Sequence, residues 1–125
     1  MLTIRPGQLD AFQETLDAAD TETIAARMRV SLPHVAYTST DEVLRDGIRT
    51  AIRRGRALGM NTIEGCQALA RLLLEVGPDC EALLPELAAI LRDPRIPPDE
   101  RPGAVLSAAP AAEWRHRLEA QRAGG

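Results

Sequence analysis

Two cysteines and two histidines are the side chains of this sequence best suited to bind a metal ion: Cys66, Cys80, His34 and His116. Zinc ligands that share a site usually include pairs about two to five positions apart. No two of these four residues are that close, so we expect no metal site and no cofactor. We expect both cysteines to be reduced, buried thiols, and Cys66 lies on the apolar face of its predicted helix. The alternative for Cys80, which follows a Gly-Pro-Asp turn at a helix end, is a more exposed position.

Nucleophilic catalysis needs a base and an orienting group that converge on a serine or cysteine. His34 and His116 fall in a predicted loop and in the C-terminal tail, and nothing in the sequence marks such a convergence. The adjacent carboxylates Asp41–Glu42 and Asp99–Glu100 lie at predicted helix starts, where the helix dipole accounts for them. We therefore expect no catalytic residues and no enzyme. An enzyme that uses Cys80 or His34 is an alternative that requires a deep pocket at one of them.

All fifteen basic residues of the chain are Arg, and none is Lys. Four of them follow a spacing of four, four and three residues and form one helical stripe: Arg45, Arg49, Arg53 and Arg56. One interpretation is a solvated helix face that pairs with Asp41, Glu42 and Asp46. The other is a partner-binding surface, which would dock on an acidic protein or on the acidic segment 75–100 of a second copy.

The region 41–76 also allows a DNA-binding interpretation, because it contains a helix, a tight turn and a second helix. A small transcriptional regulator is therefore the alternative function. The would-be recognition helix, residues 62–76, has one Arg, two Glu and mostly aliphatic side chains, a composition typical of burial. The net charge of -3 also lacks the basic excess of general nucleic-acid binders, so we do not expect nucleic acid as the partner.

The chain has 125 residues, of which 45% are hydrophobic and 26% charged, the balance of an ordinary globular domain. We expect one domain over residues 1–125, with residues 107–125 as a C-terminal helix or tail whose packing the sequence leaves open. Two cysteines do not make a disulfide framework. No apolar run is long enough to cross a bilayer, and the N-terminus lacks the pattern of a signal peptide. We therefore expect a cytoplasmic protein without membrane contacts.

Apolar residues at helical spacing predict two helices at the start of the chain. The first covers residues 8–18, and the second runs from Asp20 or Thr21 to Leu32, where Pro33 ends it. The apolar stripes are Leu9, Phe12 and Leu16 in the first helix and Ile24, Met28 and Leu32 in the second.

A third helix is predicted over residues 41–58, because Ser39 and Glu42 have the spacing of a capping box and Gly59 suits a left-handed helix end. Its expected inward residues are Val43, Leu44, Ile48, Ala51, Ile52 and Leu58. Asn61 and Glu64 repeat the capping-box spacing and begin a fourth helix. Its expected inward residues are Cys66, Leu69, Ala70, Leu72, Leu73 and Val76. Such an apolar helix is normally the central one of a bundle.

The remaining sequence predicts shorter elements. A fifth helix carries Leu83, Leu84, Leu87, Ile90 and Leu91 and stops at Asp93–Pro94. After a proline-rich turn, Asp99 and Glu100 begin a short helix that reaches Leu106, and a last segment, 111–122, has Trp114 and Leu118 as its apolar residues. The fold class is therefore all-α, a compact bundle of five to six short helices around a central aliphatic helix.

Several motifs in residues 41–106 resemble those of one protein family. They are Arg45–Ile48, Ala57–Thr62, Leu73–Asp79 with its ending Val-Gly-Pro-Asp, and Ile90–Pro94 with Glu100–Arg101. The family consists of small helical accessory proteins encoded beside type VI secretion and effector genes of Gram-negative bacteria. This resemblance implies a cytoplasmic, non-enzymatic protein that binds a secreted effector or its carrier as a chaperone, adaptor or immunity factor. The expected partner is another protein or a second copy of the chain.

Overall fold

A computed structural model describes residues 6–32 and 40–124, with the backbone alone for residues 6–16. These residues form helices and connecting turns without a strand, which confirms the all-α class. The elements are α1 (Pro6–Ser31), α3 (Asp41–Ala57), α4 (Ile63–Glu75), α5 (Cys80–Leu83), α6 (Pro85–Leu91), the 3-10 turn η1 (Pro98–Glu100), α7 (Arg101–Ala108) and α8 (Ala111–Gly124).

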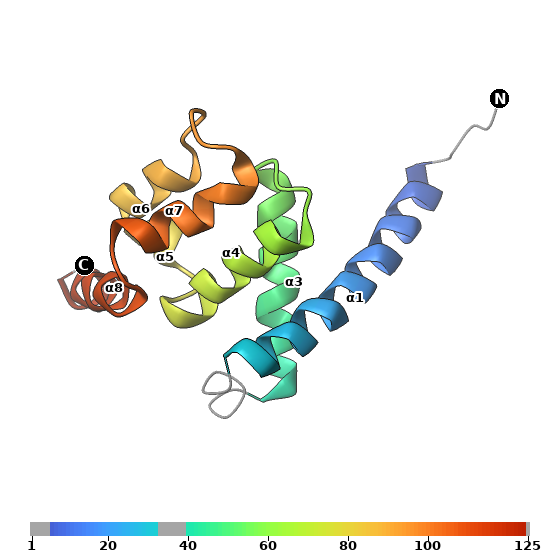
Figure 1. Ribbon diagram of the computed structural model, residues 1–125, viewed down its shortest axis with the longest axis horizontal. Helices are drawn as coiled ribbons and strands as arrows, with labels where there is room; N and C mark the ends of the chain where they lie inside the picture. Colours follow the sequence, from blue (N-terminus) through green and yellow to red (C-terminus); the bar gives the residue numbers. More distant parts are fainter. Residues whose placement is uncertain (1–5, 33–39, 125) are drawn as a thin grey trace.

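Helix α4 lies at the centre of the bundle, as its composition predicts (Figure 1). It packs against α3, α7, α1 and α8. All of its predicted inward side chains are buried, including the thiol of Cys66. The aliphatic core therefore forms around the one helix that is too apolar to lie at the surface.

Helix α1 is one continuous helix of 26 residues, so the predicted break near residue 20 is wrong. The hydroxyl of Thr21 donates to the carbonyl of Asp17, at 2.6 Å, one turn earlier. A Thr side chain that bonds back in this way continues the helix, whereas a cap would accept a bond from the following turn. The predicted stripe of Ile24, Met28 and Leu32 is buried. The N-terminal part of α1 projects past the other helices (Figure 1).

Helix α3 has its N-cap at Thr40, whose hydroxyl accepts a bond from the Val43 amide at 3.2 Å. The predicted cap, Ser39, lies outside the described residues. Val43 was expected inward, yet 54% of it is exposed, because the first turn of α3 turns it away from the buried face that Leu44 begins. At the other end Gly59 has a φ of 94°, which confirms the left-handed helix end.

Helix α4 begins one residue later than predicted, with Thr62 and not Asn61 as its N-cap. The Thr62 hydroxyl accepts a bond from the Gly65 amide at 3.0 Å. The carboxylate of Asp99, far away in the sequence, accepts bonds from the amides of Asn61 and Thr62 and from the Thr62 hydroxyl. This tertiary contact selects Thr62, which is why local spacing alone misplaced the cap.

The predicted fifth helix is two helices, α5 and α6, which separate at Leu84. Leu84 precedes Pro85 and is extended, with a φ of -116° and a ψ of 94°. Cys80, at the start of α5, is fully buried and unpaired, as expected for both cysteines, and the alternative of a more exposed Cys80 is wrong.

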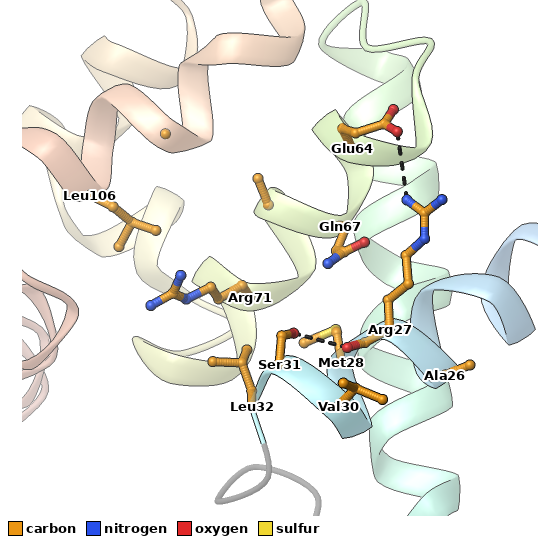
Figure 2. A pocket seen from close by; sticks show the side chains of 12 residues that line it. Ala26, Arg27, Met28, Val30, Ser31, Leu32, Glu64, Gln67, Arg71 and Leu106 are labelled. Carbon is orange, nitrogen blue, oxygen red and sulfur yellow. Dashed lines mark hydrogen bonds and ion pairs between the residues drawn. The ribbon is translucent and has the colours of Figure 1, made fainter.

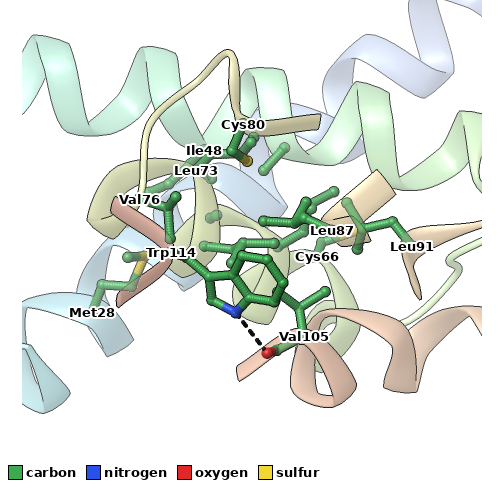
Figure 3. Packing of buried hydrophobic residues seen from close by; sticks show 14 of the residues in the cluster. Met28, Ile48, Cys66, Leu73, Val76, Cys80, Leu87, Leu91, Val105 and Trp114 are labelled. Atoms are coloured by element: carbon green, nitrogen blue, oxygen red, sulfur yellow. Dashed lines mark hydrogen bonds between the residues drawn. The ribbon is translucent and has the colours of Figure 1, made fainter. Parts of the chain in front are cut away.

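The C-terminal helix α8 packs on the bundle. Trp114 and Leu118, its two predicted apolar residues, are buried. The indole nitrogen of Trp114 donates to the carbonyl of Val105 at 2.9 Å (Figure 3). The bundle therefore includes α8, the point that the sequence left open. The described residues have more helices than the five to six predicted, because α5 and α6 replace one predicted helix.

Because α4 lies at the centre of the bundle, shortening one of its buried side chains should destabilise the fold more than the same change at a more exposed residue. Leu72→Ala removes a fully buried side chain and should lower the free energy of unfolding by about 2–5 kcal/mol. Leu83→Ala, the same change at a leucine with 37% exposure, should cost less than about 1 kcal/mol. Urea unfolding followed by far-UV circular dichroism measures both, and equal losses would contradict the central role of α4.

Candidate functional site

Two arginines of the predicted partner-binding stripe hold α1 against α3. Arg45 donates to Glu22, with its Nε 2.7 Å from Oε1. Arg56 bonds the carboxylate of Asp17 and also lies 3.8 Å from that of Asp20. All three acids belong to α1, so these guanidinium groups already have partners within the chain.

The other two arginines of the stripe lie on the outer surface of α3. Arg49 bonds Asp46 on the same helix at 3.0 Å, a pair that the solvated interpretation predicts. Arg53 is exposed and has no ion-pair partner among the described residues. A partner-binding role for Arg45, Arg49, Arg53 and Arg56 stays a prediction, with Arg49 and Arg53 the more accessible.

A neighbouring arginine, Arg54, is part of a separate ion-pair cluster. It bonds the carboxylate of Glu81, which also accepts two bonds from Arg92. Burial acts to raise the pKa of Glu81, but the two guanidinium groups outweigh it and hold that pKa below its usual value. The cluster joins α3, α5 and the end of α6, and it has the character of a structural contact.

An open groove of about 820 Å³ lies between the C-terminal part of α1, helix α4 and helix α7 (Figure 2). Its lining is Ala26, Arg27, Met28, Val30, Ser31, Leu32, Glu64, Gln67, Ala68, Arg71, Gly103 and Leu106. These residues come from three helices that are far apart in the sequence. We refer to this feature as the α1/α4/α7 groove.

The lining of the groove is mostly apolar, and its charged side chains are Arg27, Glu64 and Arg71. Arg27 lies 3.6 Å from Glu64, and Arg71 bonds Glu75 at 3.0 Å. The amide of Gln67 stands between these pairs, and it has no hydrogen bond among the described residues (Figure 2). An apolar groove with one free amide suits a ligand that is apolar along one side and polar at one point.

Gly103 lies within α7 and lines the groove without being required by the chain's own packing. A Cβ added there would meet nothing within 4 Å. Glycine within a helix costs roughly 0.5–1 kcal/mol relative to alanine. The missing side chain keeps the α7 wall of the groove open, so another backbone can approach closely.

Sequence analysis missed this groove, although α4 contains a signal for it. Glu64, Gln67 and Arg71 are spaced three and four residues apart in an otherwise aliphatic helix, which marks one polar side. This side is recessed between α1 and α7, whereas a recognition helix must protrude into the major groove. The arrangement therefore gives no specific support to the DNA-binding alternative.

The described residues among those considered for chemistry do not assemble into a site. Burial raises the pKa of the Cys80 thiol to about 11 and also raises that of Cys66. His116 is exposed on α8, and His34 lies outside the described residues. Among the side chains that the structure describes, those of residues 17–32 and 40–124, no three His, Cys, Asp or Glu are placed to hold a metal ion. In the same segments, no helix has the length and apolar character of a membrane span.

The chain matches no family model, no curated protein and no solved structure with which it was compared.

Arg56 contacts carboxylates of α1 and Arg53 contacts none that the structure describes, so removing these two side chains should change the stability of the fold by different amounts. Arg56→Ala removes contacts with two carboxylates of α1 and should lower the free energy of unfolding by about 1 kcal/mol. Arg53→Ala is the matched control and should change it by less than about 0.5 kcal/mol. Denaturant titration at low salt measures both, and an equal effect would contradict the assignment of Arg56 to the α1–α3 contact.

Burial of the two thiols predicts that they do not react while the protein is folded. A pKa near 11 leaves Cys80 with about 100-fold less thiolate than a free thiol at the same pH. Labelling with a chromogenic thiol reagent at pH 8 should therefore be slow in buffer and complete in urea. Fast labelling of the folded protein, located by mass spectrometry at Cys80, would revive the enzyme alternative.

Proposed function

We propose that this protein is a non-enzymatic binding protein that holds an amphipathic helix of another protein in the α1/α4/α7 groove. The observation that carries this proposal is the incomplete cover of α4. Its other sides are buried by neighbouring helices, while the side with Glu64, Gln67 and Arg71 is left to solvent. A helix bound there would complete the ring around the central helix.

The dimensions of the groove fit a helix. A volume of about 820 Å³ corresponds to roughly one and a half turns of α-helix with its side chains. Small residues at Ala68 and Gly103 allow a bound helix to approach α4 and α7 at the usual interaxial distance of about 8–10 Å. The ligand would place apolar side chains on Val30 and Leu106, the more exposed large apolar residues of the lining, and a polar group against Gln67.

The resemblance to accessory proteins of type VI secretion gives this binding activity a biological setting. We infer a chaperone, adaptor or immunity factor that acts in the cytoplasm on a secreted effector or its carrier. A preformed groove would cover an apolar helix of the client before secretion. Arg49 and Arg53 do not line the groove, so they would contribute only through a second, acidic contact of the client.

The proposal is tested by blocking the groove. Ala68→Arg places a long charged side chain on its floor and should weaken retention of a client at least tenfold, roughly 1.4 kcal/mol. Ala112→Arg, the same change at an exposed position of α8, should leave retention unchanged. The clients are the products of genes that neighbour this one, expressed together with the tagged full chain, and affinity is then measured by calorimetry with the purified client.

Gly103→Ala separates binding from folding. It should stabilise α7 by roughly 0.5–1 kcal/mol, because nothing obstructs the added methyl group, and at the same time weaken client binding. Equal client retention by the wild-type, Ala68→Arg and Ala112→Arg chains would place the binding surface elsewhere. Failure of the folded protein to retain any neighbouring product would count against the accessory role itself.

A further inference from the structure

The first eleven residues of α1 form an arm that extends beyond the bundle. The helix begins at Pro6, and Figure 1 shows its N-terminal part projecting away from the other helices. Eleven helical residues span about 16 Å. We define residues 6–16 as the N-terminal arm. An isolated helix of this length is marginal in water, so an arm of this kind calls for a packing partner.

The arm continues the helix face that borders the groove. Residues seven apart lie on nearly the same face of a helix. Leu9, Leu16, Thr23 and Val30 form such a series, and Val30 lines the groove with 84% of its surface exposed. By helical spacing, Phe12 belongs to the same face as this series. The apolar residues of the arm therefore share a face with an exposed apolar residue at the groove.

The charges of α1 are segregated along its length. The arm contains Asp10 and Glu14 and no basic residue. The last two turns carry Arg27 and Arg29, and Arg71 stands across the groove. Each already forms an ion pair within the chain, with Glu64, Asp41 and Glu75 respectively, so the acids of an arm would join existing pairs. Two copies of α1 that lie antiparallel would bring the acidic arm of each beside the basic end of the other, which is the attractive arrangement.

We propose that two copies of this chain pair antiparallel along α1, and that each inserts part of its arm into the α1/α4/α7 groove of the other. In a dimer with two-fold symmetry, the arm of each copy binds in the groove of the other, so neither arm and neither groove is left over. This inference rests on the proposed function, because it takes the groove as a helix-binding site and places the arm of the second copy in it. A client helix would then bind by displacing the arm, so dimerisation and client binding compete.

The proposal is tested by the mass of the full chain in solution. Sedimentation equilibrium at roughly 10 µM should give twice the chain mass of 13.5 kDa. The double variant Leu9→Glu/Phe12→Glu, which breaks the arm, and Ala68→Arg, which blocks the groove, should each be monomeric. Ala11→Glu places one such charge on a different face of the arm and should stay dimeric. Circular dichroism confirms that each variant is folded.

Mixing the two monomeric variants distinguishes arm exchange from other dimers. The blocked-groove variant has an intact arm, and the broken-arm variant has an intact groove. The mixture should therefore form a heterodimer through one arm and one groove, more weakly than the wild type dimerises. A monomeric wild type, a dimer that survives loss of the arm residues, or a mixture that stays monomeric would each overturn the proposal.

The two proposals can fail separately. A monomeric wild type that retains a client, and loses it in Ala68→Arg, would overturn arm exchange and leave the groove as the client site. A wild-type dimer that dissociates on addition of the client supports both. A dimer that dissociates in Ala68→Arg, with no client retained by any variant, supports arm exchange and overturns client binding.

Discussion

Helix α4 has so many aliphatic side chains that only a narrow strip of it can face water, and the other helices are arranged around this requirement. Leu69, Leu72 and Leu73 are buried, and each contributes on the order of 1.5–3 kcal/mol by leaving water. With one Phe, one Tyr and one Trp in the chain, the core depends on many such leucines from several helices. Trp114 is the exception, and its indole joins α8 to α7.

The arginines determine how the outer helices are held on this core. Arg45 and Arg56 connect α3 to α1, and Arg122 bonds Asp79, which holds α8 at the start of α5. Arg101 is half-buried and donates to backbone carbonyls of Leu58 and of the loop before α7. The planar guanidinium group, with several donors in fixed directions, suits these contacts. Much of the arginine content of the chain is thus used for its own tertiary structure.

This arrangement leaves two features at the edge of the bundle, the open α1/α4/α7 groove and the N-terminal arm, which projects past the other helices (Figure 1). The groove exists because α1 and α7 stand apart over the polar side of α4. The arm exists because α1 is longer than the bundle it packs on. A bound helix is the simplest ligand for the first feature and a second copy of the chain for the second. Both functions that we propose for this protein therefore depend on surfaces at the edge of the helix packing.

The sequence by itself determined the all-α class, the central place of α4 and most of the core, because helical spacing of apolar residues reports directly which face is buried. It misplaced what depends on contacts between distant residues. Thr62 replaces Asn61 as a cap through Asp99, and Arg45 and Arg56 find their acids on α1 rather than on their own helix. The groove was likewise decided by tertiary structure. Periodicity shows that one side of α4 is polar, but only packing decides whether a neighbouring helix covers it.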